Sequence, residues 1–205
     1  YEQDYYVSSN NFSAYRLIES WPNWPDKCVN IFGPKGCGKT HLSNIFIKKI
    51  KSYYVEAGDL KNIDMIKNIE NKECLIIDDY KNNIKENEFY SILNFLRQAN
   101  KYVIINSIFP IKNEKIKLND LKSRLNSFID VGIELPTDEL LRVIISKYFS
   151  DKQIDITPKI SEYIIKNIER SYEKVFKFIK EIDDLSLSSG KSININLIKK
   201  VLINE

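Results

Sequence analysis

Residues 28–42 read CVNIFGPKGCGKTHL, and this stretch decides the fold. It opens with a short apolar run at residues 28–32, which is typical of a buried strand. Residues 33–40 then match the pattern G-x-x-x-x-G-K-[ST], and apolar residues recur after it at helical spacing. A strand, a glycine-rich turn and a helix in this order are the context in which the pattern indicates a phosphate-binding loop.

Each part of this loop has a physical task. Its glycines let consecutive backbone N–H groups turn toward phosphate oxygens, and the following helix adds the positive end of its dipole. Lys39 is predicted to reach the terminal phosphates, and the Thr40 hydroxyl to bind Mg²⁺. Cys37 is expected to be a small residue that fits the turn, and the His41 side chain favours a structural role. The predicted nucleotide-binding set is Gly33, Pro34, Lys35, Gly36, Cys37, Gly38, Lys39, Thr40 and His41.

A second apolar run, residues 73–78, ends in two aspartates. A carboxylate at the carboxyl end of a parallel strand lies in the crevice where the phosphate loop opens. Asp78 is therefore predicted to share the metal with Thr40, and Asp79 to align and polarise an attacking water. The alternative, a turn-initiating aspartate pair, is less favoured beside a phosphate loop. Asn106 and Ser107 end a further strand, where they either contact the terminal phosphate or water, or simply end the strand.

The rest of the chain alternates strands and helices up to residue 135 and is helical afterwards. Such alternation is typical of a parallel sheet covered on both faces. Further strands are predicted at residues 52–56, 102–106 and 128–135, and helices at 11–21, 39–51, 60–71 and 86–100. Thr137, Thr157, Ser171 and either Asn194 or Asn196 are candidate caps of the later helices. We predict an α/β domain of residues 1–136 with a five-stranded parallel sheet, a lead-in at 1–27, and a small all-helical domain at 137–205.

Composition narrows the function classes. The 205 residues include 31 basic and 28 acidic side chains, and a net charge of +3 gives no argument for nucleic-acid binding by itself. No apolar run reaches the roughly 18 residues of a membrane span. Cys28, Cys37 and Cys74 lack metal-site spacing, so a reduced, cytoplasmic setting is expected. The first residue is Tyr1, and we expect a trimmed start. Trp21 and Trp24 are expected to be core anchors.

Beyond the phosphate loop, several segments resemble the DnaA family of AAA+ proteins, P-loop enzymes with a helical lid. They are the loop extended to GKTHL at residues 38–42, IIDD at 76–79 and LKSRL at 121–125. The lead-in YYVSSNN at 5–11 is similar to the family's N-terminal nucleotide-covering segment, in which Asn11 takes the place of an asparagine near the nucleotide. The WPNWP element at 21–25 resembles more narrowly the short Hda branch, which lacks the family's DNA-reading domain.

This resemblance implies a regulator of replication initiation. Such a protein binds ATP or ADP with Mg²⁺ and, on the DNA-loaded sliding clamp, stimulates hydrolysis of ATP held by DnaA. Arg124 falls on the family's arginine finger, which projects onto the γ-phosphate of a neighbouring subunit and is worth roughly 10³–10⁵ in rate. The implied catalytic residues are Asp79, Arg124 and Asn106. No sequence-specific DNA contact and no membrane is implied, and whether the chain forms a homodimer stays open.

Three positions depart from the family pattern. The second-sensor arginine is replaced by Glu173, which predicts weak hydrolysis by the chain itself or ADP as its resting ligand. Ile108 stands where the initiator has an acidic first-sensor residue, and no clamp-binding motif is visible in residues 1–4 of the sequence. Two other functions stay open: a self-sufficient ATPase such as a helicase loader, and an initiator fragment without its DNA-binding domain.

Overall fold

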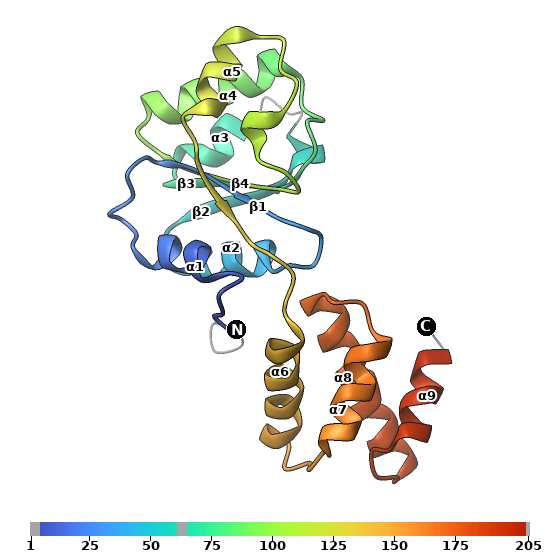
Figure 1. Cartoon of the computed structure of the whole chain (residues 1–205). Coiled ribbons are helices and arrows are strands. Elements are labelled where there is room, and N and C mark those ends of the chain that lie inside the picture. The colour runs from blue at the N-terminus through green and yellow to red at the C-terminus, as the bar shows by residue number, and fades with distance from the viewer. Residues whose placement is uncertain (1–4, 61–64, 204–205) are drawn as a thin grey trace. The chain divides into compact units, whose positions relative to one another are not determined.

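The first part of the protein is built on one parallel sheet. The structure, a computed structural model, describes residues 5–60 and 65–203. Within them, five strands lie side by side in the order β2-β3-β4-β1-β5, and every neighbouring pair is parallel (Figure 1). This confirms the predicted five-stranded parallel sheet. The strands are β1 (Cys28–Phe32), β2 (Ser52–Glu56), β3 (Cys74–Tyr80), β4 (Tyr102–Ser107) and β5 (Ile129–Gly132).

Helices cover both faces of this sheet. Figure 1 shows α1 (Phe12–Glu19) and α2 (Lys39–Ile47) on one face. The other face carries α3 (Met65–Glu70), α4 (Glu86–Gln98) and α5 (Asn119–Asn126). Side chains alternate between the faces along each strand. Val55, Ile77 and Ile105 therefore belong to the core beneath α4 and α5, whereas Ile76 and Ile104 face the α2 side.

A buried asparagine joins two strands and a short turn of 3₁₀ helix, η3 (Ile111–Asn113). Asn30 is fully buried, and its amide nitrogen donates to the Ile105 carbonyl (2.9 Å) and to Ser107 Oγ (2.8 Å). Its carbonyl oxygen accepts from the Ile111 N–H (3.0 Å). Because a buried amide is costly unless it is bonded, these three contacts fix where the chain leaves β4.

The helix and strand limits differ from the predicted ones for local reasons. Helix α2 ends at Ile47, before residue 51, because the next N–H groups bond three residues back instead of four. Strand β5 stops at Gly132, since its partner β1 ends at Phe32. Helix α5 was not predicted, because only Leu121 and Leu125 mark its buried side. Of the helix predicted at 60–71, residues 61–64 lie outside the described residues, and the 3₁₀ turn η2 (Ala57–Asp59) precedes them.

The lead-in is held by aromatic contacts. Trp24 stacks on Phe46 of α2 with ring centroids 5.0 Å apart, and its indole N–H donates to the Leu17 carbonyl. Trp21 meets the same ring edge-on at 6.0 Å. Both tryptophans thus anchor the end of α1 to α2, as expected. Ala14 and Ile18 are the buried residues of α1, whereas Phe12 is 51% exposed.

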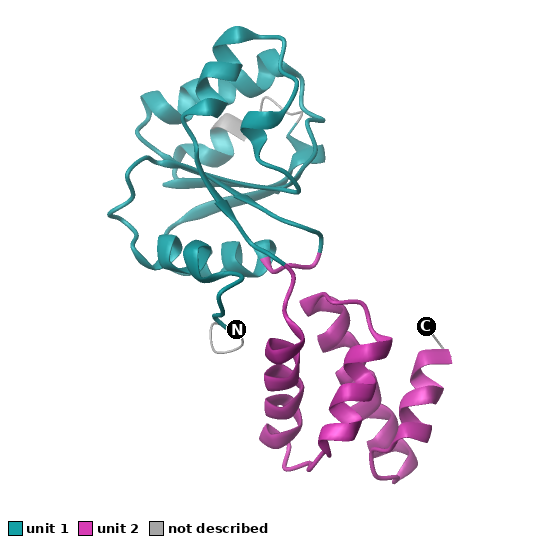
Figure 2. Cartoon of the chain, viewed as in Figure 1, with its two compact units in different colours: residues 1–35, 39–134 teal, residues 36–38, 135–205 magenta. Residues whose placement is uncertain are grey.

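Two compact units make up the chain, residues 1–35 with 39–134 and residues 36–38 with 135–205 (Figure 2). The second unit contains α6 (Asp138–Asp151), α7 (Pro158–Asn167), α8 (Tyr172–Ser189) and α9 (Ile195–Ile203). Their apolar faces meet around fully buried residues such as Phe149, Phe178 and Ile198. Buried Asp183 of α8 bonds the ammonium of Lys152, which satisfies a charge inside this bundle. Among the described helices none is long and apolar enough to span a membrane.

The caps of these helices follow the sequence in part. Thr137 Oγ1 accepts from the Leu140 N–H, and Ser171 Oγ from the Lys174 N–H, as predicted. Asn194, one of the two candidates, caps α9 by accepting from Leu197. Thr157 occupies the N-cap position of α7 and Pro158 the first helical position, as predicted, but the Thr157 side chain makes no capping bond.

Replacing Asn30 by alanine is expected to lower the free energy of unfolding by about 3 kcal/mol, because it leaves buried donors and acceptors of β4 and η3 unpaired. Urea unfolding followed by circular dichroism measures this loss. The matched control is Asn126→Ala at the exposed end of α5, for which a change within about 0.5 kcal/mol is expected. Equal unfolding midpoints for the two variants would contradict the role given to Asn30.

Candidate functional site

One carboxylate gathers donors from three elements at the carboxyl edge of the sheet. Asp78, near the end of β3, is only 6% exposed. Its Oδ2 accepts from Thr40 Oγ1 of α2 (2.7 Å) and from the hydroxyl of Tyr54 on β2. Its Oδ1 accepts from the amide nitrogen of Asn106 on β4 (3.1 Å) and from the Asp79 N–H (2.9 Å). The structure thus brings Thr40, Asp78 and Asn106, three predicted site residues, into one cluster.

The strand register explains why these side chains meet. Tyr54 pairs with Ile76, and Ile76 pairs with Ile104. Paired residues of parallel strands point to the same side, and residues two apart do so as well. Tyr54, Asp78 and Asn106 therefore all lie on the face that α2 covers.

Asn106 has one polar atom without a partner. Its amide nitrogen donates to Asp78 and to Ser43 Oγ of α2 (2.8 Å). Its Oδ1 is buried and meets no hydrogen-bond donor among the described residues. An unpaired buried acceptor points to a missing donor, such as a water molecule beside Asp78. Ser107 takes no part, since it accepts from Asn30 and donates to the Phe109 carbonyl.

The phosphate loop leads from β1 into α2. Gly36 and Gly38 have φ angles of 79° and 102°, a region that side chains with a Cβ rarely adopt, so the loop requires glycine there. The Lys39 ammonium donates to the carbonyls of Gly33 (2.7 Å) and Pro34 (2.9 Å). Lys39 is therefore folded back onto the loop, with its charge next to the turn where phosphates were predicted. Pro34 and Lys35 are exposed, and Cys37 is fully buried as a small residue of the turn.

Tyr54 was not among the predicted site residues, although its hydroxyl donates to Asp78. Burial, and then its bond to Asp78, raise the pKa of the Tyr54 hydroxyl well above its usual range, so this group stays a donor. The neighbouring Tyr53 instead accepts from Asn68 (3.3 Å). Alternation along β2 could have placed one of the two tyrosines on the α2 face, but only the sheet order puts β2 beside β3.

Asp79 does not join the cluster. Its backbone φ is 52°, within a register shift of β3 against β4 between Ile77 and Tyr80. This irregularity turns the side chain outward, where it is 60% exposed and forms an ion pair with Lys81 (2.6 Å). The predicted role of Asp79 in aligning and polarising an attacking water stays a prediction.

Asn11 belongs to the lead-in, and His41 packs against it. The Asn11 side chain accepts from the Ser8 N–H and donates to the Tyr6 carbonyl, both at 2.8 Å, which fixes the turn before α1. The ring of His41, one residue after Thr40, meets the ring of Tyr5 edge-on with centroids 5.3 Å apart. These contacts are structural, and nucleotide contact by either residue stays a prediction.

Arg124 lies at the opposite edge of the sheet. It belongs to the last turn of α5, which is followed by the start of β5, so it stands at the amino ends of the strands. A side chain there cannot serve the phosphate loop at the carboxyl edge of the same sheet. Glu173, in the first turn of α8, and Ile108, after β4, are both exposed.

The donor set fits a magnesium–nucleotide group. A hydroxyl and a carboxylate, joined here at 2.7 Å, are hard oxygen ligands of the type that Mg²⁺ prefers. Among the described residues there is no cluster of three or more carboxylate, histidine or cysteine side chains that would hold a metal ion by itself. Such sparse protein coordination is typical of Mg²⁺ that is bound largely through substrate phosphates and water.

Known proteins share this fold. A family model described as RNA helicase matches residues 29–117, less than half of the chain. The initiator DnaA of Buchnera aphidicola is 27% identical over an alignment 215 residues long, gaps included. The alignment covers 93% of this chain and 48% of the relative. Domain III of the Thermotoga maritima replication initiation protein DnaA superposes with a TM-score of 0.79 at 18% identity, covering 98% of this chain and 95% of that one. The chain has a DnaA-like AAA+ fold.

Two further proteins are similar to this chain over most of its length. The AMPPCP-bound DnaA of Aquifex aeolicus gives a TM-score of 0.73 at 24% identity, covering 92% of this chain and 66% of that one. An uncharacterized protein of Haemophilus influenzae is 23% identical over 84% of this chain and 80% of its own length. The DnaA-like chain spans about half the length of the curated DnaA relatives that it matches.

Tyr54→Phe is expected to raise about tenfold the Mg²⁺ concentration at which ADP half-maximally stabilises the DnaA-like chain, because Asp78 loses a donor that orients it. Thermal unfolding at fixed ADP and varied Mg²⁺ measures this. Tyr53→Phe removes the adjacent hydroxyl, which bonds Asn68 instead, and should leave the Mg²⁺ requirement unchanged. If both variants behaved alike, the bond from Tyr54 to Asp78 would have no part in metal binding.

Proposed function

We propose that this chain binds ADP or ATP with Mg²⁺ at the Asp78 cluster and the phosphate loop. The observation that carries this proposal is the Thr40–Asp78–Asn106 cluster directly beside the glycine-rich turn. Backbone N–H groups of residues 33–40 would hold the phosphate oxygens, and Lys39 would exchange its two carbonyl partners for the terminal phosphates. Thr40 and Asp78 would hold the magnesium ion, which offsets phosphate charge when bound.

Asn106 completes this proposed site. Its unpaired, buried Oδ1 would accept a hydrogen bond from a water beside the terminal phosphate, while its amide nitrogen stays on Asp78. Water alignment by Asp79 remains part of the proposal, although that carboxylate now pairs with Lys81. With Glu173 at the place of the second-sensor arginine, slow hydrolysis by the chain alone is expected.

We further propose that the chain acts in replication initiation by promoting hydrolysis of ATP bound to a DnaA partner. The likeness to DnaA over 93% of the chain supports a replication role. The position of Arg124 supports action in trans, because it lies at the sheet edge opposite the phosphate loop. Its planar cation would contact the γ-phosphate in the partner. The sliding clamp as a second partner rests on the resemblance alone.

An alternative is supported by a specific observation. The chain covers 95% of the separately solved domain III of an initiator, as an initiator fragment would. The relative from Haemophilus influenzae, of which 80% is covered, favours the short DnaA-like protein instead. Stimulation of ATP turnover in DnaA separates the two, and fast turnover by the isolated chain would indicate a self-sufficient ATPase such as a helicase loader.

The nucleotide site is tested by thermal unfolding with MgADP and MgATP. A ligand at about 100 times its dissociation constant should stabilise the chain by about 2.7 kcal/mol. Lys39→Ala is expected to remove most of this stabilisation, because it deletes the charge beside the phosphates. Lys48→Ala, an exposed lysine just after α2, should keep it. If MgADP or MgATP stabilised Lys39→Ala as much as the unmodified chain, the proposed nucleotide site would be wrong.

The trans role is tested with DnaA of the same cell loaded with radiolabelled ATP, together with clamp-loaded DNA. Arg124→Ala should lower the stimulated rate by about 10³, the lower end of what arginine fingers supply. Lys122→Ala on the same helix is exposed and should stimulate like the unmodified chain. Equal stimulation by Arg124→Ala would show that no finger acts through this residue.

A further inference from the structure

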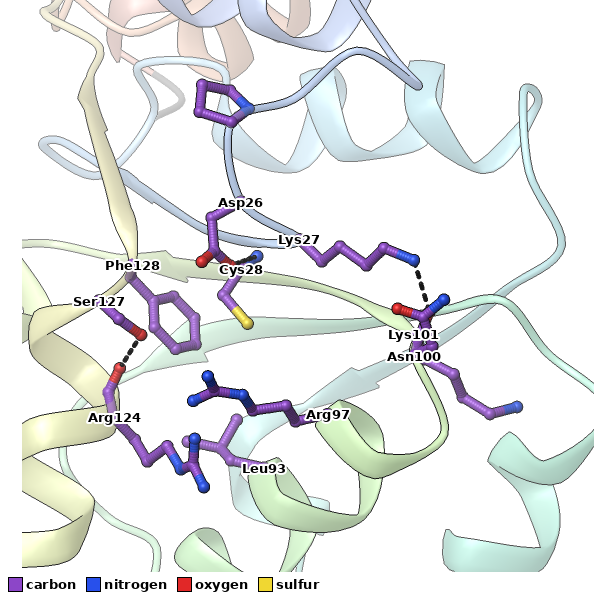
Figure 3. Close-up of a pocket in the computed structure, with 11 residues that line it drawn as sticks. Asp26, Lys27, Cys28, Leu93, Arg97, Asn100, Lys101, Arg124, Ser127 and Phe128 are labelled. Atoms are coloured by element: carbon purple, nitrogen blue, oxygen red, sulfur yellow. Dashed lines mark hydrogen bonds between the residues drawn. The ribbon is translucent and has the colours of Figure 1, made fainter.

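A second arginine shares a pocket with Arg124. The pocket has a volume of about 290 Å³ and lies at the amino edge of the sheet, where β1 begins and where α4 and α5 end. Figure 3 shows Arg97, from the last turn of α4, and Arg124, from the last turn of α5, lining it together with Leu93. Both arginines and the whole pocket belong to the sheet unit.

The other charged groups of this pocket already have partners. The Lys101 ammonium donates to the carbonyls of Ile69, Glu70 and Lys72, and the Lys27 ammonium to that of Asn100. Asp26, the carboxylate in the lining, accepts from the Cys28 N–H (3.0 Å). Burial, and then Asp26, raise the pKa of the Cys28 thiol to about 12, so it stays neutral. The pocket therefore keeps an excess of positive charge.

The guanidinium groups of Arg97 and Arg124 carry this excess. In the part of the chain that the structure describes, neither group forms an ion pair with a carboxylate. Two like charges at one pocket repel each other until an anion lies between them. Each guanidinium offers five N–H donors in a planar fork that matches phosphate or carboxylate oxygens. Only five of the 31 basic residues are arginines, and two of them meet here.

The size of the pocket limits how large a bound anion can be. Pockets that enclose a drug-sized ligand measure about 300–1,000 Å³, so this pocket is at the small end. It suits a phosphate tail that another molecule presents better than a whole nucleotide. A carboxylate side chain would satisfy one fork, whereas the terminal oxygens of a triphosphate can satisfy both.

We infer that Arg97 and Arg124 together form a two-guanidinium site for the terminal phosphates of the nucleotide that the partner holds. The inference rests on the proposed function and adds Arg97 as a second catalytic residue. In the partner, water adds to the γ-phosphorus and the bond from that phosphorus to the β–γ bridging oxygen breaks. ADP leaves with the bridging oxygen, and the protons of the water stay on the inorganic phosphate or pass to solvent. Negative charge then grows on the oxygens that face the two guanidinium groups. Arg97 and Arg124 stabilise this charge without exchanging a proton.

The test measures single-turnover hydrolysis of DnaA-bound ATP at saturating and at varied concentrations of the chain. Arg97→Ala is expected to lower the saturated rate at least tenfold. Arg97→Lys should recover only part of it, because an ammonium lacks the fork. Gln98→Ala, the exposed next residue of α4, is the control and should match the unmodified chain. The double variant Arg97→Ala with Arg124→Ala should lose less than the product of the two single losses, because both residues act on one phosphate group.

The outcomes separate this inference from the function on which it rests. If Arg124→Ala is defective and Arg97→Ala is normal, Arg97 has no part and the finger stands. If both variants stimulate like the unmodified chain, the arginine finger and this inference both fail. If the unmodified chain does not stimulate DnaA at all, the proposed trans function itself fails. A lower affinity of Arg97→Ala with an unchanged saturated rate would make Arg97 a docking residue and overturn the inference.

A free phosphate ligand is tested separately. In a Lys39→Ala background, tripolyphosphate should not stabilise the isolated chain. Stabilisation that Arg97→Ala removes would assign the pocket to a free polyphosphate and overturn the partner-held assignment. Equal unfolding midpoints of all variants exclude misfolding.

Discussion

Asp78 is the acceptor on which the carboxyl edge of the sheet depends. A hydroxyl from α2, a phenol from β2 and an amide from β4 all donate to this one buried carboxylate. A buried carboxylate is tolerated only when its oxygens are satisfied, so each donor is needed for the fold as well as for the site. The same bonds hold the start of α2, and with it the end of the phosphate loop, at a fixed height above β3. Structural and functional demands thus meet in a single side chain.

The central part of this arrangement could be predicted from local sequence. The loop pattern follows a strand and precedes a helix, and the apolar run that ends in Asp78 identifies a neighbouring strand of a parallel sheet. Because carboxyl ends of parallel strands share one edge, Thr40 and Asp78 were expected near one another, and Asn106 was a candidate for the same site. Hydrogen bonds join all three. Alternation along the strands also predicts which face is apolar, and Ile77 and Ile105 do lie in the core under α4 and α5.

Other features could not be predicted from local sequence, because they depend on the order of the strands or on irregular backbone. Tyr54 reaches Asp78 only because β2 pairs with β3, and nothing near Tyr54 in the sequence indicates that neighbour. Asp79 was expected to align an attacking water, and a register shift at the end of β3 turns its side chain to solvent. Helix α5 has two buried leucines in eight residues, too few for a periodic pattern. The meeting of Arg97 with Arg124 joins the ends of two helices and has no local signal at all.

The parallel sheet also gives the molecule two chemically different edges. All strands run the same way, so the phosphate loop and Asp78 lie at one edge, and the ends of α4 and α5 with their arginines lie at the other. On the proposed function, the phosphate site at one edge and the guanidinium groups at the other are complementary between molecules of this fold but cannot meet within one sheet. Surfaces of this kind would associate head to tail rather than through a two-fold axis. In that geometry the arginines of one molecule would face the nucleotide of the next, so the proposed chemistry requires a partner and does not require that the chain hydrolyse its own nucleotide rapidly.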